Sequence, residues 1–445
     1  MLRSTRAVPP PEHGSEHGIR LHGGRYREAE ALSPPEWARG GMLYSIYPRA
    51  FSAEGTLAAI LPRLDRIVSL GASAIWLLPI HPVGVDGRKG SRGSPYAIRD
   101  YRSLDPALGR PEDLRGLVDA AHARGLRVIV DFVANHAAPD HVLAGEHPDW
   151  FARDRRGRPA RRVRDWTDVA DWRFEAEGVV EYLAASAAFW VREAGIDGYR
   201  CDVAGMVPRS FWGETHRRLG ALRPDHFMLA EWQDPELHTI AFHASYDWAL
   251  YRALRDAVRG KAGASAVTDA LRGWRDHFPA AALPLRFLEN HDEPRALAVF
   301  GEEHLHAAAA VAFLSGGLPL LYNGQEAGAI HRPSLFEAEP IAWPAAESWP
   351  LDMYRGLLAL CRTAPWGVGA AEPLDSGAPD AVAFARMEGG RRGVVVVNLG
   401  RGTATARPHG KALAQRYHAV QGSPETWIPG DSLALEPGGL WVGVA

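Results

Sequence analysis

Residues 195–205, with the sequence GIDGYRCDVAG, place an arginine and an aspartate two positions apart in a stretch typical of a short buried strand. On a strand, Arg200 and Asp202 project from the same face. The neighbouring guanidinium is expected to lower the pKa of the Asp202 carboxyl and to keep it ionised. An ionised aspartate at the end of a strand can act as the nucleophile of covalent catalysis. A buried structural ion pair is the alternative that these two residues alone leave open.

Other apolar runs of the chain also end on side chains that can do chemistry. Three of the motifs are DFVANH, FMLAEW and LENHD, and a fourth, GSPYAIRDY, follows an apolar run as a loop. Together they supply Asp131, Asn135, His136, Glu231, Trp232, Asn290, His291, Asp292, Tyr96 and Asp100. The interiors of the same runs are apolar, so the pattern predicts that the polar side chains gather at one edge of a parallel sheet.

Three carboxylates, Asp202, Glu231 and Asp292, would then face one opening. Cleavage of a glycosidic bond uses two carboxyl groups, a proton donor and either a nucleophile or a base. Because Asp202 and Glu231 end consecutive strands, we expect the close spacing of a retaining mechanism with a covalent glycosyl intermediate. Glu231 follows an apolar strand and precedes Trp232, which suits a proton donor. The alternative is a metal site formed by these acids and Asp131, and the arginine beside Asp202 counts against it.

The elements that would position these groups recur along the chain. Apolar runs predicted as strands lie at residues 42–47, 73–80, 126–133, 198–202, 227–230, 244–247, 285–288 and 318–322, and helical patterns at 57–71, 111–125, 179–194, 208–222, 248–260, 304–314 and 350–362. Strands that are apolar throughout are buried on both faces, which is typical of parallel sheets. Eight such units over about 320 residues predict an α/β fold, a (β/α)8 TIM barrel.

The predicted domains follow from changes in composition. Residues 1–40 are rich in Pro, Gly and charge and read as a lead-in segment, in which His13, His17 and His22 are expected to be solvated. Residues 41–365 form the predicted barrel, with 137–177 as a short insertion after the third strand, whose basic run 155–164 is expected to be solvated surface. Residues 366–445 are short β-type runs that predict a C-terminal antiparallel β-sandwich.

The overall composition excludes some classes of function. The 50 Lys and Arg residues nearly balance the 53 Asp and Glu residues, for a net charge of −3, which argues against a nucleic-acid-binding protein. No apolar run has the length of a membrane span or of a signal peptide, so we expect a cytoplasmic protein with no membrane partner. The two cysteines, Cys201 and Cys361, fit a reducing compartment and show no zinc-binding spacing.

Taken together, the motifs resemble the α-amylase family, glycoside hydrolase family 13, from about residue 41 to residue 366. The resemblance implies that Asp202 is the nucleophile, Glu231 the acid/base and Asp292 a transition-state stabiliser. It further implies that Arg200, His136 and His291 hold the nucleophile or the sugar at the cleavage point, that Tyr96 stacks on that sugar, and that Asp100 accompanies it. We add Trp232 as a further expected substrate contact.

Two departures from the family bear on a metal and on the substrate. Many endo-acting members carry a Lys-His pair that helps to bind the leaving group and contributes to a calcium site, and here those positions are Gly205 and Met206. Asn135 matches a calcium-ligand position, yet it could equally hydrogen-bond a loop. We therefore expect that no cofactor is required, and Asn135 marks where a structural calcium ion would bind.

The resemblance implies a retaining hydrolase that cleaves α-1,4-glucosidic bonds of maltooligosaccharides or starch. An α-glucanotransferase or an exo-acting α-glucosidase would use the same intermediate, and the missing Lys-His pair keeps both open. A non-catalytic carbohydrate-binding protein is a remote alternative, because all three acids are present. The expected partner is an α-glucan oligosaccharide, and the sequence leaves the oligomeric state open.

Overall fold

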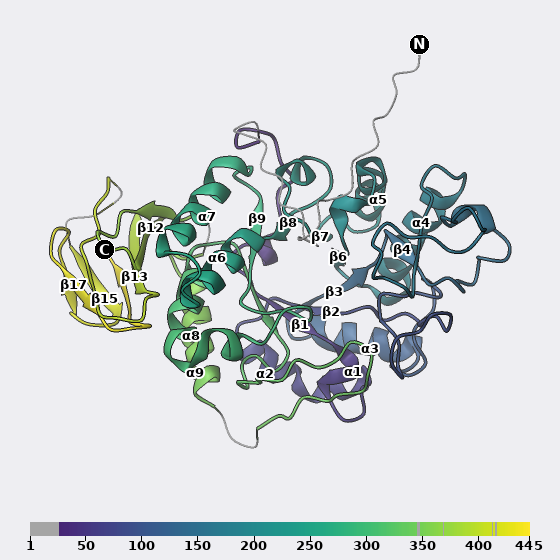
Figure 1. The fold of residues 1–445 in the computed structure, drawn as a ribbon, viewed down its shortest axis with the longest axis horizontal. Coiled ribbons are helices and arrows are strands. Elements are labelled where there is room, and N and C mark those ends of the chain that lie inside the picture. The colour runs from purple at the N-terminus through teal and green to yellow at the C-terminus, as the bar shows by residue number, and fades with distance from the viewer. Residues whose placement is uncertain (1–25, 345–347, 368, 412, 414–415) are drawn as a thin grey trace, which may run out of the picture.

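Parallel strands closed into a barrel form the centre of the protein (Figure 1). The computed structural model describes residues 26–445 apart from 345–347, 368, 412 and 414–415, so His13, His17 and His22 lie outside the described residues. The barrel strands pair in the order β1-β2-β3-β6-β7-β8-β9-β10, and β10 returns to β1. Their bounds are Leu43–Ile46, Ala74–Leu77, Arg127–Phe132, Gly198–Cys201, Phe227–Ala230, Ala244–Tyr246, Leu283–Arg286 and Leu318–Tyr322. The predicted (β/α)8 barrel is confirmed.

Side chains of the barrel strands alternate between two apolar clusters. On β2 and β7, Trp76 and Leu229 belong to the cluster that fills the barrel, whereas Ile75 and Met228 belong to the cluster between strands and helices. Both faces of each strand are thus buried, which explains why these strands read as continuous apolar runs. Arg200 is the charged exception on β6, and its guanidinium lies 5.3 Å from the Trp76 ring centroid.

The helices surround this barrel. They are α1 (Pro48–Phe51), α2 (Leu64–Ser69), α3 (Pro111–His122), α4 (Val179–Ala194), α5 (Arg209–Leu222), α6 (Trp248–Val258), α7 (Ala264–His277), α8 (Ala296–Leu314) and α9 (Trp349–Cys361). Short 3-10 helices lie at η1 (Glu36–Ala38), η2 (Ala58–Arg63), η3 (Pro148–Trp150), η4 (Ala204–Met206) and η5 (Pro235–Thr239). The helix predicted over 57–71 is divided into η2 and α2, because Pro62 has no backbone N–H for a continuous α-helix. The helix predicted from residue 304 begins earlier, at Ala296, and is kinked at Gly301.

Helix α8 is long and apolar enough to cross a membrane, with a mean hydropathy of 1.2. However, 67% of its apolar window is buried inside the protein, where the helix packs against α6, α9 and β10. A core helix of a folded domain meets the same criteria of length and composition. Among the described residues, no other helix meets them.

The chain between β3 and α4 forms a small lobe beside the barrel, at the right of Figure 1. It contains the two-stranded sheet of β4 (His136–Ala137) and β5 (Ala170–Asp171), together with η3. Trp150, Phe151 and Trp172 pack together beneath it, and the Phe151 and Trp172 ring centroids are 4.4 Å apart. These aromatic side chains belong to the same apolar cluster as the residues between the barrel strands and the helices, so they join a lobe with little regular structure to the barrel.

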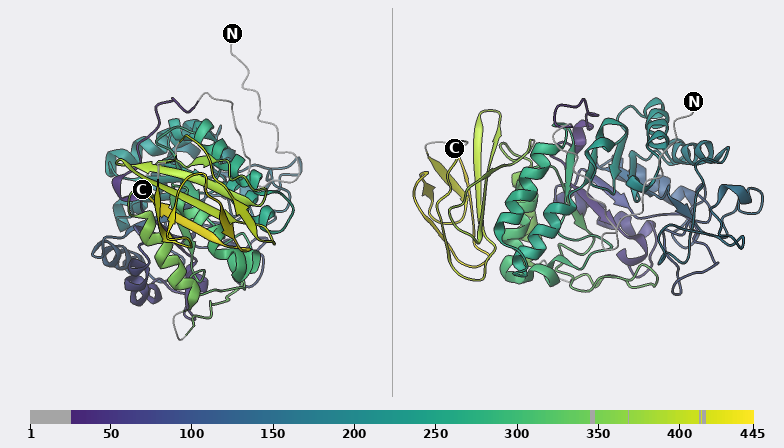
Figure 2. Two further views of the ribbon diagram at one scale, coloured as in Figure 1. Left: turned by 90° about the vertical axis from the view of Figure 1, so that its left-hand side faces the viewer. Right: turned by 45° about the horizontal axis from the view of Figure 1, so that its top comes forward.

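The C-terminal residues form a separate β module that packs beside α7 and α8 (Figure 2). Its main sheet has the order β11-β12-β13-β18-β15-β16, and β14 pairs with β17 in a second sheet. The strands are Glu372–Leu374, Ala381–Glu388, Arg391–Asn398, Leu440–Val444, Tyr417–Gln421, Thr426–Trp427, Ala404–Ala406 and Leu433–Leu435, in the order just given. These strands pair antiparallel, as predicted.

Candidate active site

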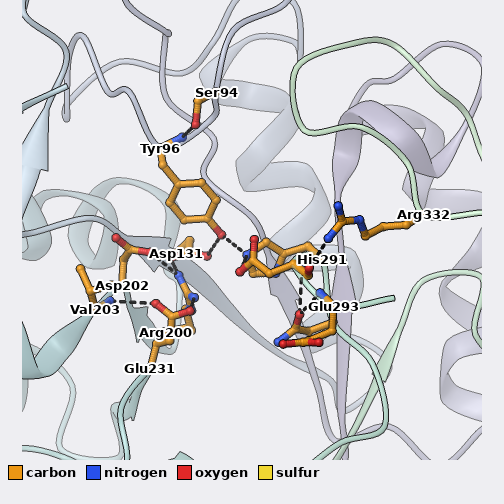
Figure 3. Close-up of polar contacts among 12 residues, drawn as sticks. Ser94, Tyr96, Asp131, Arg200, Asp202, Val203, Glu231, His291, Glu293 and Arg332 are labelled. Atoms are coloured by element: carbon orange, nitrogen blue, oxygen red, sulfur yellow. Dashed lines mark hydrogen bonds and ion pairs between the residues drawn. The ribbon is translucent and has the colours of Figure 1, made fainter. Parts of the chain in front are cut away.

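One buried arginine holds three carboxylates at the C-terminal ends of neighbouring strands (Figure 3). Arg200 Nη1 lies 2.7 Å from Asp131 Oδ1 and 2.9 Å from Asp202 Oδ1, and Nη2 lies 2.6 Å from Glu231 Oε1. Asp131 lies on β3, Asp202 follows β6 and Glu231 follows β7, which are adjacent in the barrel. The predicted projection of Arg200 and Asp202 from one face is confirmed, and a single guanidinium brings Asp202 and Glu231 together.

A glycine permits the close packing of the two strands that carry this pair. A Cβ atom at Gly198, the first residue of β6, would lie 1.9 Å from the carbonyl oxygen of Phe227 on β7. Any other residue would push β6 and β7 apart. The register of the pairing, in which Cys201 faces Ala230, then places Asp202 directly beside Glu231.

The charges of this cluster do not balance, because three acids share one arginine. Burial raises the pKa of Asp131 to about 6, against the opposing effect of Arg200. Burial and then the charge of Glu231 raise the pKa of Asp202 well above its usual value, and Arg200 only partly offsets this. The expected lowering of the Asp202 pKa is therefore wrong: the loss of water around the carboxylate outweighs the nearby guanidinium.

The turn after Asp202 orients Glu231. Val203 has φ 36° and ψ 48°, a left-handed conformation that costs a β-branched residue about 1 to 2 kcal/mol. In this conformation its backbone N–H donates a 2.9 Å hydrogen bond to Glu231 Oε2. One oxygen of Glu231 thus faces Arg200 and the other faces the Val203 N–H, so the apolar environment expected for this side chain is wrong. Strain next to a candidate nucleophile is typical of functional sites.

Tyr96 and His291 continue the site beside the Arg200 cluster (Figure 3), and Asp292 follows His291 in the chain. The Tyr96 hydroxyl lies 2.6 Å from His291 Nε2 and 3.1 Å from Asp131 Oδ2, and the Tyr96 and His291 rings are stacked 5.6 Å apart. His291 Nε2 is also 3.1 Å from Asp292 Oδ2. The Asp292 side chain is 36% exposed, so this carboxylate remains open to a ligand while its neighbours are buried.

These side chains line a cavity of about 580 Å³. The lining residues include Tyr96, His136, Asp202, Glu231, His291 and Asp292 from the prediction, and Lys89, Ser94, Trp166, Asp168, Val169, Val203, His331, Arg332, Pro333, Ser334, Leu335, Phe336 and Glu339 in addition. The walls are the loop after β2, the lobe after β3 and the loop after β10. A cavity of this size accommodates a small molecule or the end of an oligosaccharide, and carboxylates lie at its floor.

His136 is a neutral ring at the edge of this cavity. Burial, and then the charge of Arg162, lower its pKa to about 3. Its Nδ1 lies 3.0 Å from Asn135 Nδ2, which is a donor, so the network assigns the ring proton to Nε2. The His136 ring also contacts Trp166, with the centroids 5.0 Å apart. His136 can therefore donate a hydrogen bond to a sugar hydroxyl.

Two predicted substrate contacts lie away from the cavity. The Asp100 carboxylate accepts hydrogen bonds from the Arg102 backbone N–H and the Ser103 hydroxyl, at 2.9 and 2.6 Å, and thereby fixes a turn. Trp232 is buried in the apolar core, and a Cβ atom at Gly205 would lie 2.1 Å from its ring. The indole thus fills the space that a side chain at position 205 would need. The predicted roles of Asp100 and Trp232 in binding substrate are not supported by their positions.

The calcium site implied by Asn135 does not fit the side chains present. Arg162 Nη2 donates to Asn135 Oδ1, Nη1 lies 2.9 Å from the Met206 carbonyl oxygen, and Nε lies 2.9 Å from Asp171 Oδ2. A guanidinium already faces the oxygens that would ligate the ion. Arg162 lies at the surface, as expected for residues 155–164, with a side chain that is 51% exposed, but its guanidinium is also bound to these oxygens, which the sequence did not predict. Within the described part of the chain, no group of three or more His, Cys, Asp or Glu side chains is arranged to hold a metal ion.

Sequence reasoning missed two parts of the cavity wall. Lys89 forms a 3.1 Å ion pair with Asp168 of the lobe, donates to the Asp165 carbonyl oxygen and lies 5.8 Å from the Phe336 ring centroid. The segment 331–339, which follows β10, supplies a large share of the lining. Neither segment carries a motif, and residues 336 and 89 are far apart in the chain. The aromatic side chains of residues 137–177 are the signal that could have indicated this wall, because Trp166 is one of them and lines the cavity.

Comparisons with known proteins agree with this geometry. The model of the α-amylase catalytic domain matches residues 40–169 and 163–348. An α-amylase from Haloarcula japonica is 31% identical over 429 residues, covering 91% of this chain and 62% of the relative, so the chain spans about three fifths of that protein's length. The solved structure of an α-amylase from Lactobacillus plantarum has a TM-score of 0.83 at 31% identity, covering 92% of this chain and 99% of that one. A maltogenic α-amylase from Thermotoga neapolitana has a TM-score of 0.80 at 29% identity, with coverages of 91% and 96%.

Proposed function

Because the chain belongs to the α-amylase family of glycoside hydrolases, we propose that it cleaves α-1,4-glucosidic bonds of maltooligosaccharides or starch with retention of the anomeric configuration. The observation that carries the proposal is the pair of carboxylates, Asp202 and Glu231, bound to the two terminal nitrogens of the Arg200 guanidinium. Such closely spaced acids suit a covalent intermediate, whereas inversion needs a wider gap that admits a water molecule.

In this mechanism Asp202 attacks the anomeric carbon while Glu231 gives its proton to the leaving oxygen. The glycosyl ester on Asp202 is then hydrolysed by a water molecule, whose proton returns to Glu231. Because the charge of Glu231 is one cause of the raised pKa of Asp202, protonation of Glu231 favours ionised Asp202. The reaction requires a neutral acid and a charged nucleophile in the same molecule.

The other side chains of the cavity would hold the sugar that is attacked. His136 offers an Nε2–H donor, and His291 and the partly exposed Asp292 can bind sugar hydroxyls on the opposite side. Tyr96 presents its ring to the cavity, while the hydroxyl is fixed by Asp131 and His291. Rings fixed in this way stack on the apolar face of a sugar without losing further rotational freedom.

The test uses maltoheptaose with the unmodified protein and with the Glu231→Gln variant. We expect new shorter sugars whose first-formed anomer, observed by proton nuclear magnetic resonance, is α. The glutamine variant should lose about 10² to 10⁴-fold in rate, because it cannot transfer the proton. A first product of β configuration would contradict retention, and equal rates for the two proteins would contradict the assignment of the acid.

Exo-acting cleavage that releases short products is a second candidate, and the wall around Lys89 favours it. Lys89 and Tyr96 lie on the same loop, and the Lys89–Asp168 ion pair joins this loop to the lobe that carries Trp166. The wall therefore lies on the side of the sugar that is attacked, where it would limit how much of the chain can extend past Asp202. The maltogenic relative releases maltose by its name, which agrees with a closed end.

A time course on maltotriose and maltoheptaose separates the candidates. On maltoheptaose, early release of glucose or maltose together with the one correspondingly shortened chain indicates exo-action, and a mixture of lengths indicates endo-action. Chains longer than the substrate indicate an α-glucanotransferase. If the wall sets the outcome, Lys89→Ala should lengthen the early products, and Arg88→Ala, its neighbour on the same loop, should not.

A further inference from the structure

Three oxygens from three different segments meet at the guanidinium of Arg162. They are the amide oxygen of Asn135 after β3, the carboxylate of Asp171 on β5 and the backbone carbonyl of Met206 in η4. The backbone N–H of Arg162 also donates to Asp171 Oδ2, at 2.9 Å. Asn135 and Asp171 are buried, so their oxygens depend on this arginine for a cationic partner.

This set of oxygens is of the kind that would otherwise bind a hard cation. Carboxylate, amide and backbone carbonyl oxygens are the ligands that calcium takes in proteins. The second carboxylate oxygen, Asp171 Oδ1, is buried and has no hydrogen-bond partner among the described residues. Asn135, and Met206 as one of the pair Gly205 and Met206, are also positions at which the family resemblance implied a calcium site. The segments and the ligand chemistry are therefore present, and the guanidinium of Arg162, whose side chain is 51% exposed, contacts all three oxygens.

We propose that the guanidinium of Arg162 replaces a structural calcium ion and clamps the lobe between β3 and α4 to the barrel without a metal. A planar guanidinium with five donors can reach three acceptors on different segments, whereas a lysine ammonium is a compact point charge. The clamp closes the site from two sides, because Asn135 precedes His136 and Met206 lies four residues after Asp202. Arg162 is thus a positioning residue, and it acts on His136 through the Asn135 amide.

The clamp also accounts for the state of His136. With its oxygen bound by Arg162, the Asn135 amide must present its nitrogen to His136 Nδ1, which leaves the ring proton on Nε2. A calcium ion on Asn135 Oδ1 would orient the amide in the same way. The exchange of ion for guanidinium therefore preserves the donor that faces the cavity.

The test measures thermal unfolding and calcium binding, neither of which needs a substrate, so it stands apart from the proposed hydrolysis. The variants are Arg162→Ala, Arg162→Lys and, as a matched control, Arg164→Ala, which removes an exposed arginine from the same loop. Each protein is melted in EDTA and in millimolar CaCl₂, and calcium binding is measured by titration calorimetry.

We expect the unmodified protein to melt at the same temperature in both solutions and to bind no calcium. R162A should melt lower in EDTA by about 2 °C or more, bind calcium, and regain much of the loss in CaCl₂, because its three oxygens are then free for the ion. R162K should fall between the two, and R164A should match the unmodified protein.

Three results would overturn the proposal. The first is an unmodified protein that binds calcium and is stabilised by it. The second is an R162A variant as stable as the unmodified protein. The third is an R162A variant that melts lower and gains nothing from calcium, since a guanidinium that merely packs in the loop would behave in this way.

Discussion

Strand β6 has an aspartate at each end, and the two have opposite surroundings. Asp197, before the strand, faces three basic side chains: His122 Nε2 at 2.7 Å, Arg127 Nη1 at 3.3 Å and Arg223 Nη1 at 2.5 Å. It also accepts a hydrogen bond from the Val128 backbone N–H. Asp202, after the strand, shares a single arginine with two other acids.

The difference separates stability from chemistry along a strand of four residues. An acid bound by three basic side chains and a backbone N–H has its oxygens occupied, and it fixes α3 and the neighbouring strands to β6. An acid that competes for one cation is poorly stabilised as an anion, and in the proposed mechanism the ester formed with the substrate would relieve this repulsion. Asp202 lies at the C-terminal end of the strand, where the cavity opens, so its carboxylate can reach a ligand.

The largest expected effect comes from Asp202→Asn. Hydrolysis of maltoheptaose should fall by about 10⁴-fold, because the amide is isosteric and cannot form the glycosyl ester. The melting temperature should stay the same or rise, since the change removes a buried charge that shares its only cation. If the variant loses activity and also melts at a much lower temperature, Asp202 has a structural role like that of Asp197.

Asp197→Asn should show the reverse behaviour. Loss of this carboxylate leaves three basic side chains without their acceptor, and we expect unfolding to become easier by about 2 kcal/mol. The value is modest for a buried acid because His122, Arg127 and Arg223 are 28%, 35% and 22% exposed and can be solvated. Activity per folded molecule should remain within about twofold at a temperature well below the transition. Urea unfolding gives the first quantity and initial rates give the second.

The sequence predicted this arrangement where the signal was local. Two-residue spacing placed Arg200 and Asp202 on one face, and apolar runs that end in acids located the edge of the barrel. It failed where contacts join distant segments: Arg162 meets Asn135 and Met206, and Trp232 occupies the space beside Gly205. No spacing rule reveals such contacts.

The pKa of Asp202 was misjudged for a related physical reason. The sequence shows that an arginine is adjacent, but it does not show that the carboxyl is buried or that Asp131 and Glu231 compete for the same guanidinium. Burial has the larger effect here, and burial is a property of the whole fold. The same limit applies to Lys89 and Asp168, whose ion pair closes the cavity across two loops that carry no common pattern.

Asp131→Asn sharpens the comparison by removing one of the acids that compete for Arg200. The charge of Asp131 is among the causes that raise the pKa of Asp202, so the variant should move the acidic limb of kcat/KM to lower pH. The carboxyl of Asp131, with its pKa raised to about 6, holds its proton in the folded protein between about pH 4 and pH 6 while the unfolded chain has lost it. This group therefore makes the protein less stable as the pH rises through that window.

The asparagine cannot ionise, so the variant should lack this part of the decline. Melting temperatures measured from pH 4 to pH 7 should converge at the acidic end and separate in favour of the variant at the neutral end. An acidic limb that does not move would show that Asp131 does not influence the nucleophile. A constant difference in melting temperature between the two proteins from pH 4 to pH 7 would show that Asp131 stays ionised over this range.

The smallest expected effect is that of His122→Gln at the other end of the strand. Asp197 would keep Arg127, Arg223 and the Val128 N–H, so one lost partner should cost about 0.5 to 1 kcal/mol of unfolding free energy. Glutamine can still donate to Asp197 Oδ2, which limits the loss further. Asp202 lacks such a set of alternative partners. Among the described residues, Arg200 is the only basic side chain that forms an ion pair with Asp202. A loss of unfolding free energy as large as that of Asp197→Asn would mean that the three basic side chains cannot substitute for one another. The two ends of β6 would then differ in the number of basic partners, but not in how much each aspartate depends on a single partner.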